Sequence, residues 1–116
     1  MAYNEFLTDR VSQFFLEKNV SFKIEKMMGG LCFMVDGKMC VGIVRDEIMA
    51  RIDPDIYTAS LLKPGCKEMN FTGRPIKGFV FLTDEATDLD VHLHYWLQLA
   101  LDFNPKAKAS KKRKKR

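Results

Sequence analysis

The dipeptide Asp36-Gly37 constrains the fold of this chain more than any other feature, because it separates two short apolar runs, LCFMV and MCVGIV. Asp-Gly between apolar segments is the strongest local signal for a β-hairpin with a two-residue turn. The sequence therefore predicts antiparallel strands over residues 31–35 and 38–44. Such a loop would set the register as Val35 with Lys38, Met34 with Met39, Phe33 with Cys40, and Cys32 with Val41.

Both faces of the predicted hairpin are apolar. Alternate residues of a strand point to opposite sides of a sheet. One face would carry Leu31, Phe33 and Val35, and the other Cys32, Met34, Met39 and Val41. Because each apolar face needs a cover, helices are expected on one side, and further helices or a second copy of the chain on the other. A homodimer is one of these two expected arrangements.

The segments before the hairpin show two different hydrophobic periods. In residues 4–19 the apolar positions recur at helical spacing, which predicts a helix that buries one stripe. That stripe consists of Leu7, Val11, Phe14 and Phe15, and Asn19 suits the end of the helix. Residues 20–27 alternate between apolar and polar, as a half-exposed strand does. The chain is thus expected to begin with a helix and a strand.

After the hairpin, a strand is predicted over residues 48–52 and a short helix over 53–63, with Asp53 as N-cap and Pro54 at its first position. A further strand is predicted over residues 78–82. The last helix is expected to be capped by Thr87, with Asp90 at the capping-box position. Its predicted apolar stripe is Leu89, Leu93, Trp96, Leu97 and Ala100.

Strands that arrive in runs as hairpins, rather than alternating with helices, indicate the α+β class. The expected order is α, a β-run, α, one or two strands, and α, which gives an antiparallel β-sheet packed by helices. A chain of 116 residues that is 47% hydrophobic can bury one core. One domain is therefore predicted for residues 1–105.

The three cysteines do not form a paired motif, which favours free thiols and a reducing compartment such as the cytoplasm. In the register above, Cys32 and Cys40 would point to opposite faces and could not share a metal or a disulfide. His92 and His94 are two residues apart, a spacing that does not suit chelation from one helix. We expect no metal, no cofactor and, because no base–nucleophile signature appears, no catalytic residue and no enzyme activity.

Residues 106–116 differ sharply in charge from the rest of the chain. This segment holds eight of the 19 Lys and Arg residues and none of the 15 acids, so its formal charge is +8 while residues 1–105, with 11 cations, carry −4. Such a block is expected to be a disordered tail that binds nucleic-acid phosphates without sequence preference. Its cations are Lys106, Lys108, Lys111, Lys112, Arg113, Lys114, Lys115 and Arg116. A solvated solubility tail is the alternative.

Two glycine-containing turns are candidate anion sites. In TGRPIKG, Pro75 favours an extended Arg74, so Arg74 and Lys77 are a possible anion contact. Gly29 and Gly30 could approach a phosphate, but they lead into a strand instead of a helix, which favours a tight connection between strands. The chain has neither an apolar run of membrane-spanning length nor the layout of a signal peptide, so no membrane association is expected.

The segments KMMGGLCFMVDGKMCVGIV, RIDP and EMNFTGRPIKGFVF together resemble the N-terminal domain of the TfoX (Sxy) competence regulators, over about residues 3–104. The resemblance implies an α+β fold similar to the small type III secretion chaperones. It also implies transcriptional regulation, since full-length members act as co-activators with the cyclic-AMP receptor protein, and it carries no catalytic residues. Those regulators have a second, C-terminal domain, and this chain has the basic tail in that position.

Two functions follow from these observations. The first is a non-catalytic regulatory domain that associates with nucleic acid through its tail and with a transcription-factor partner. The second is a dimeric, chaperone-like protein-interaction domain without a nucleic-acid role.

Overall fold

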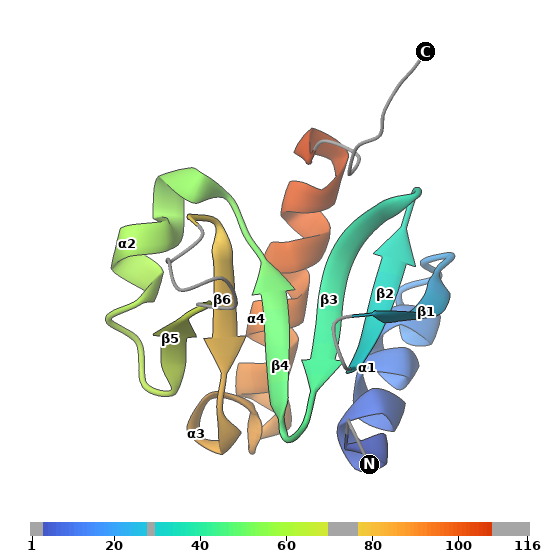
Figure 1. Cartoon of the computed structure of the whole chain (residues 1–116), viewed down its shortest axis with the longest axis horizontal. Helices are drawn as coiled ribbons and strands as arrows, with labels where there is room; N and C mark the ends of the chain where they lie inside the picture. The colour runs from blue at the N-terminus through green and yellow to red at the C-terminus, as the bar shows by residue number, and fades with distance from the viewer. Residues whose placement is uncertain (1–3, 28–29, 70–76, 108–116) are drawn as a thin grey trace.

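A computed structural model of the chain describes residues 4–27, 30–69 and 77–107. In these residues, helices and strands follow the predicted α+β order (Figure 1). The strands are β1 (Lys23–Met27), β2 (Gly30–Val35), β3 (Lys38–Val44), β4 (Glu47–Arg51), β5 (Cys66–Glu68) and β6 (Phe79–Leu82). The helices are α1 (Glu5–Glu17), α2 (Tyr57–Ser60), α3 (Asp84–Thr87) and α4 (Asp90–Phe103), with 3₁₀ turns η1 (Pro54–Ile56) and η2 (Asn104–Lys106).

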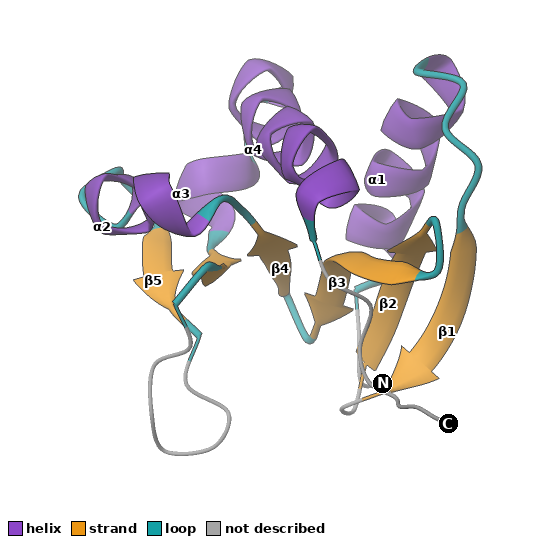
Figure 2. Ribbon diagram, turned by 90° about the horizontal axis from the view of Figure 1, so that it is seen from above, coloured by secondary structure: helices purple, strands orange, loops and turns teal. Residues whose placement is uncertain are grey.

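The six strands form one antiparallel sheet in the order β1-β2-β3-β4-β6-β5. All four helices lie on the same face of this sheet, with α4 between α1 on one side and α2 and α3 on the other (Figure 2). The fold is therefore a two-layer α+β arrangement, as predicted. Within the described residues, no helix combines the length and apolarity needed to cross a bilayer.

Helix α1 forms where its sequence predicts. The side chain of Asn4 caps it by accepting hydrogen bonds from the backbone N–H groups of Phe6 and Leu7, at 2.9 and 3.1 Å. The four residues of its predicted stripe are all buried. The helix ends where Asn19 adopts a φ of 60°, in the left-handed region that Asn tolerates better than most residues. Helical period and capping chemistry together specify this element.

The hairpin turn is also confirmed. Asp36 and Gly37 both have positive φ, 59° and 75°, as a two-residue turn that follows the twist of the strands requires. Val35 pairs with Lys38, and Met34 with Met39, as predicted. The predicted pairs beyond them are wrong, because a bulge at Cys40 shifts the register: Phe33 pairs with Val41, and Cys32 pairs with Gly42.

The bulge moves residues between the two faces of the sheet. Val41 lies with Phe33 in the core beneath the helices, not on the opposite face with Cys32 as expected. With this register, the pairing itself no longer supports the prediction that Cys32 and Cys40 point to opposite faces. The homodimer stays a prediction.

The C-terminal third contains one helix that the sequence did not predict. Asp53 caps η1 as expected, accepting from the backbone N–H of Asp55 at 2.8 Å. Thr87, however, is not the cap of the last helix. It is the final residue of α3, and its hydroxyl donates to the carbonyl of Thr83 at 3.3 Å. Helix α4 begins at Asp90, whose carboxylate binds Arg10 instead of completing a capping box.

The apolar stripe of α4 is largely as predicted, because Leu93, Trp96, Leu97 and Ala100 are buried. Leu89 precedes the helix and is exposed. Strand β5 pairs with β6 through Cys66 and Leu82, so the turn before β5 is brought beside α3 and α4. This pairing creates the hollow described below.

Candidate functional site

The predicted nucleic-acid and anion residues fall mostly outside the described residues. Lys106 lies in η2, is exposed, and its Nζ is 3.8 Å from a carboxylate oxygen of Asp53. Lys77 is exposed in the turn before β6. Outside the described residues lie Arg74 and the other seven cations of the tail, Lys108, Lys111, Lys112, Arg113, Lys114, Lys115 and Arg116. That the tail cations bind nucleic acid, and that Arg74 and Lys77 contact an anion, stay predictions.

The start of the tail is fixed to the domain. Asn104 is buried, and its side-chain amide donates to the backbone carbonyl of Val35 at 3.2 Å. This hydrogen bond ties the end of α4 to the β2–β3 hairpin. Ala107, directly after Lys106, is buried too. Lys106, the first cation of the tail, therefore follows two residues after a contact with the β2–β3 hairpin.

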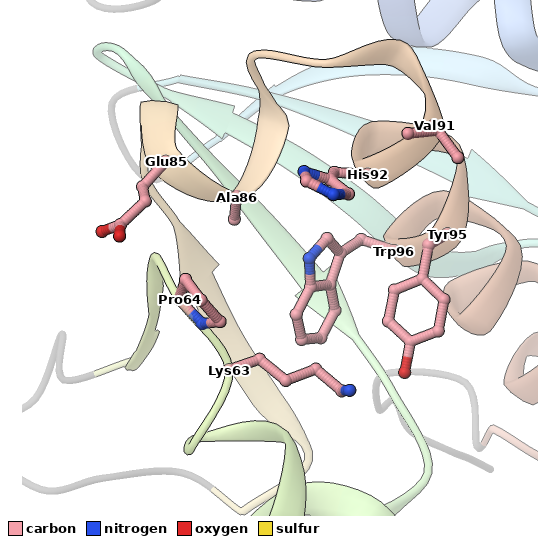
Figure 3. A pocket seen from close by; sticks show the side chains of 8 residues that line it. All are labelled: Lys63, Pro64, Glu85, Ala86, Val91, His92, Tyr95 and Trp96. Atoms are coloured by element: carbon pink, nitrogen blue, oxygen red, sulfur yellow. The ribbon is translucent and has the colours of Figure 1, made fainter.

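A second candidate site is an apolar hollow of about 370 Å³ between α4 and the turn that leads into β5. We call it the Trp96 groove. Figure 3 shows that its walls come from three segments, of which the first is distant in the sequence from the other two. They are the turn before β5, with Lys63 and Pro64; α3, with Glu85 and Ala86; and α4, with Val91, His92, Tyr95 and Trp96.

Gly65 allows the turn before β5 to pack this closely against α3. Its φ is +78°, and a Cβ at this position would lie 2.5 Å from the backbone nitrogen of Ala86 and 2.8 Å from its Cβ. Only glycine fits both the conformation and the space. The carbonyl of Gly65 also accepts a hydrogen bond from the backbone N–H of Thr83 at 2.9 Å. The groove is thus a built feature of the fold rather than a gap between loose loops.

The interior of the groove is aromatic. Trp96 is only 3% exposed, and its indole ring faces the hollow between Lys63, Pro64 and Tyr95 (Figure 3). The rings of Tyr95 and Trp96 meet edge to face, with their centroids 5.2 Å apart. Tyr95 and Val91 are 43% and 69% exposed at the rim. The groove therefore presents apolar surface that water reaches.

Lys63 supplies the positive charge at this rim. Its Nζ lies 5.3 Å from the centroid of the Tyr95 ring, a cation–π distance. It forms no ion pair with any residue that the structure describes. The carboxylate of Glu85 points away from the hollow (Figure 3). An anionic group that entered beside Tyr95 would therefore meet an unneutralised ammonium.

A hollow of similar size, about 330 Å³, lies on the other flank of α4, against α1. Its lining includes Asp9, Gln13 and Glu17, and Arg10 bridges it by an ion pair with Asp90, at 2.9 Å. His94 also lies here, with its ring centroid 4.8 Å from that of Phe14. His92 and His94 are thus on different flanks of α4.

The cysteines are buried free thiols. Burial raises the pKa of Cys32 to about 11, of Cys40 to about 12 and of Cys66 to about 11. The charge of Glu25 adds to the shift at Cys32. A thiol must ionise to act as a nucleophile or a metal ligand, so these shifts oppose both uses. Among the described residues, no cluster of three or more His, Cys, Asp or Glu is placed to hold a metal.

Sequence reasoning did not find the Trp96 groove. Lys63 and Tyr95 are 32 positions apart, and only the pairing of β5 with β6 brings their segments together. One signal was nevertheless present: Val91 and Tyr95 are one helical turn apart on α4, outside its buried stripe. Apolar residues on the exposed side of a helix point to an interaction surface.

The chain matches the family model of the TfoX N-terminal domain over residues 15–104. The matched region contains the whole Trp96 groove and excludes residues 106–116. Comparison with curated proteins and with solved structures gives no match. The family is not known as an enzyme family, and it supports a regulatory or interaction role in general terms. Because this match covers most of the chain, the chain belongs to the TfoX N-terminal domain family.

Proposed function

We propose that the protein is a non-catalytic regulatory domain that associates with nucleic acid through its C-terminal tail. The observation that carries the proposal is the segregation of charge: eight cations and no acid in residues 106–116, against a net −4 in residues 1–105. Because the tail lies outside the matched region, nucleic-acid binding would be an addition to the family domain. Three buried free thiols suit a reducing compartment, so we place the protein in the cytoplasm.

The chemistry of the tail supports non-specific binding. It has cations to pair with phosphates, but no aromatic residue to stack on bases. Lys106 is near Asp53, so seven cations remain for phosphate contacts. If all seven are used on duplex DNA, counterion release gives a slope of log K against log salt of about −6. Counterion release by the tail favours the complex at low salt, although the acidic body opposes binding.

Salt-dependent binding to a duplex of random sequence tests this proposal. The wild-type chain is compared with a full-length variant in which the seven cations beyond Ala107 are replaced by Ser. We expect the variant to lose most of its affinity and its salt dependence. If the variant keeps most of the affinity, the contact lies in the body, and Arg74 and Lys77 would be the next residues to replace. Strong preference for one promoter sequence would also contradict electrostatic binding.

A second candidate function is a protein-interaction domain without a nucleic-acid role. The Trp96 groove favours it, because this hollow exposes aromatic and aliphatic side chains on a rigid wall. The partner would be a transcription factor or a second copy of the chain. Sedimentation of the tail variant at micromolar concentration tests the homodimer, and a strictly monomeric chain would exclude it.

A further inference from the structure

Exposed apolar side chains are frequent in the two segments that carry the lining of the Trp96 groove. Seven large hydrophobic residues are exposed among those that the structure describes, and four of them lie on the two segments that flank the groove. These four are Leu62, Leu89, Val91 and Tyr95, with exposed fractions of 86, 59, 69 and 43%. Val91 and Tyr95 line the hollow, and Leu62 is next in sequence to the lining residue Lys63. Such an arrangement fits a polypeptide better than a compact small molecule.

The charge at the rim restricts the occupant further. The ammonium of Lys63 lies over an aromatic ring without an ion pair among the described residues, and the carboxylate of Glu85 is turned away. An apolar segment that carries a carboxylate could place its apolar side chain against Trp96 and its charge beside Lys63. The tail of this chain is a poor occupant, because it is cationic and has no apolar residue larger than Ala.

We propose that the Trp96 groove docks an acidic, aromatic-containing peptide segment of a partner protein. A large apolar side chain fills the hollow against Trp96 and Tyr95, and a neighbouring Asp or Glu pairs with Lys63. This inference deepens the interaction role of the domain and is independent of nucleic-acid binding by the tail. Trp and Tyr are the residue types that most often dominate the binding energy of such contacts.

The chain contains one tryptophan, so tryptophan fluorescence reports on this groove alone. The probes are two matched peptides without tryptophan, acetyl-Glu-Phe-Leu-Glu-amide and acetyl-Lys-Phe-Leu-Lys-amide, titrated into the full chain. We expect the acidic peptide to change the fluorescence of Trp96 with saturation. The basic peptide should bind up to about fivefold more weakly, since one rim ion pair contributes up to about 1 kcal/mol.

Two pairs of variants separate the groove from general charge effects. Lys63→Glu should weaken the acidic peptide by about fivefold or more. Its control is Lys18→Glu, because the Nζ of Lys18, directly after α1, lies 5.5 Å from the centroid of the Phe14 ring in a similar cation–π contact. Val91→Glu should also weaken binding, and Leu16→Glu, at an exposed site on α1, should not. All four changes are on the surface, so the fold is retained.

Several results would overturn the proposal. Equal binding of the two peptides, or equal loss in Lys63→Glu and Lys18→Glu, would show that Lys63 does not select the ligand. Phenylacetate binding as tightly as the acidic peptide would indicate a small-molecule site. A Trp96 signal that depends on protein concentration and disappears in Val91→Glu would indicate a second copy as the occupant. Replacing the tail cations by Ser should leave the Trp96 response intact even if nucleic-acid binding is lost.

Discussion

The two flanks of α4 carry hollows of nearly equal size but opposite chemistry. Against α1 the hollow measures about 330 Å³, and its cation, Arg10, is paired with Asp90. Against the turn before β5 it measures about 370 Å³, and its cation, Lys63, faces only the Tyr95 ring among the described residues. Volume does not distinguish the two flanks. Exposed apolar side chains and an unpaired charge do.

We call the side of α4 that faces α1 the closed flank, because its cation is paired, and the side with the Trp96 groove the open flank. The Arg10–Asp90 pair joins α1 to the first turn of α4, so the cation of this flank is already paired. The other flank is kept open by the turn at Gly65, which packs on Ala86 and leaves Trp96 as the floor. We therefore propose that the open flank is the one that binds a partner, while the buried residues of both flanks stabilise the fold.

The largest expected effects come from the buried walls of both flanks. Trp96→Ala should lower the free energy of unfolding by about 3–5 kcal/mol, and Leu93→Ala by about 2–5 kcal/mol, because each leaves a cavity in the core. Urea denaturation measures both changes. Val91→Ala, at an exposed site, is the control and should stay within about 0.5 kcal/mol. A cost below about 1 kcal/mol for Trp96→Ala would mean that the floor of the groove is not part of the core.

Gly65→Ala should destabilise the open flank selectively. The new Cβ meets Ala86 at a positive φ, so strain and overpacking together should cost about 2–4 kcal/mol. Gly37→Ala is the matched control, since its φ is +75° but a Cβ there meets no atom within 4 Å. It should cost about 1 kcal/mol. Equal costs by urea denaturation would show that the turn does not pack on α3 as described.

Alkaline pH should lower the free energy of unfolding, because the three buried cysteine thiols ionise more readily in the unfolded chain. The pKa of each thiol is raised from 9.0 to about 11 or 12 in the folded chain. Between pH 9 and 11 the unfolded chain therefore binds fewer protons than the folded one, and the free energy of unfolding falls as pH rises. At pH 10 the loss is about 1 kcal/mol per thiol, and below pH 8 it vanishes. Urea denaturation of wild type and Cys66→Ala at pH 8 and 10 measures it.

The smallest effects should separate the two rim cations. Arg10→Gln breaks a pair whose arginine side chain is only 16% exposed, so it should cost about 0.5–1 kcal/mol. Lys63→Gln removes only a cation–π contact at an exposed site and should cost less than about 0.5 kcal/mol. Thermal unfolding of both variants in low salt tests the order. A larger cost for Lys63→Gln would reverse the roles of the flanks.

The elements that local chemistry specifies were predicted well. The stripe of α1, the Asp36-Gly37 turn and the Asp53 cap depend on spacing or on one residue type, and the structure has all three. The match over residues 15–104 confirms the family that the hairpin and FTGRP segments indicated.

Features that depend on tertiary contacts were missed. The bulge at Cys40 inserts one residue into the pairing of β2 with β3, which no local pattern revealed. As a result, Val41 lies on the face of Phe33 and not on the predicted face of Cys32. Thr87 looked like a cap, but its hydroxyl satisfies the carbonyl of Thr83 within α3. The Trp96 groove needs strand β5, only three residues long, to place Lys63 near Tyr95. Such contacts join segments whose spacing in sequence carries no signal.

Chemical-shift mapping of the full chain with acetyl-Glu-Phe-Leu-Glu-amide tests most directly whether only the open flank binds. We predict that the backbone amides of Lys63, Val91 and Tyr95 and the indole N–H of Trp96 shift together. Those of Arg10 and Gln13 on the closed flank should stay in place. Shifts on the closed flank, or equal shifts on both, would contradict the assignment of binding to the Trp96 groove.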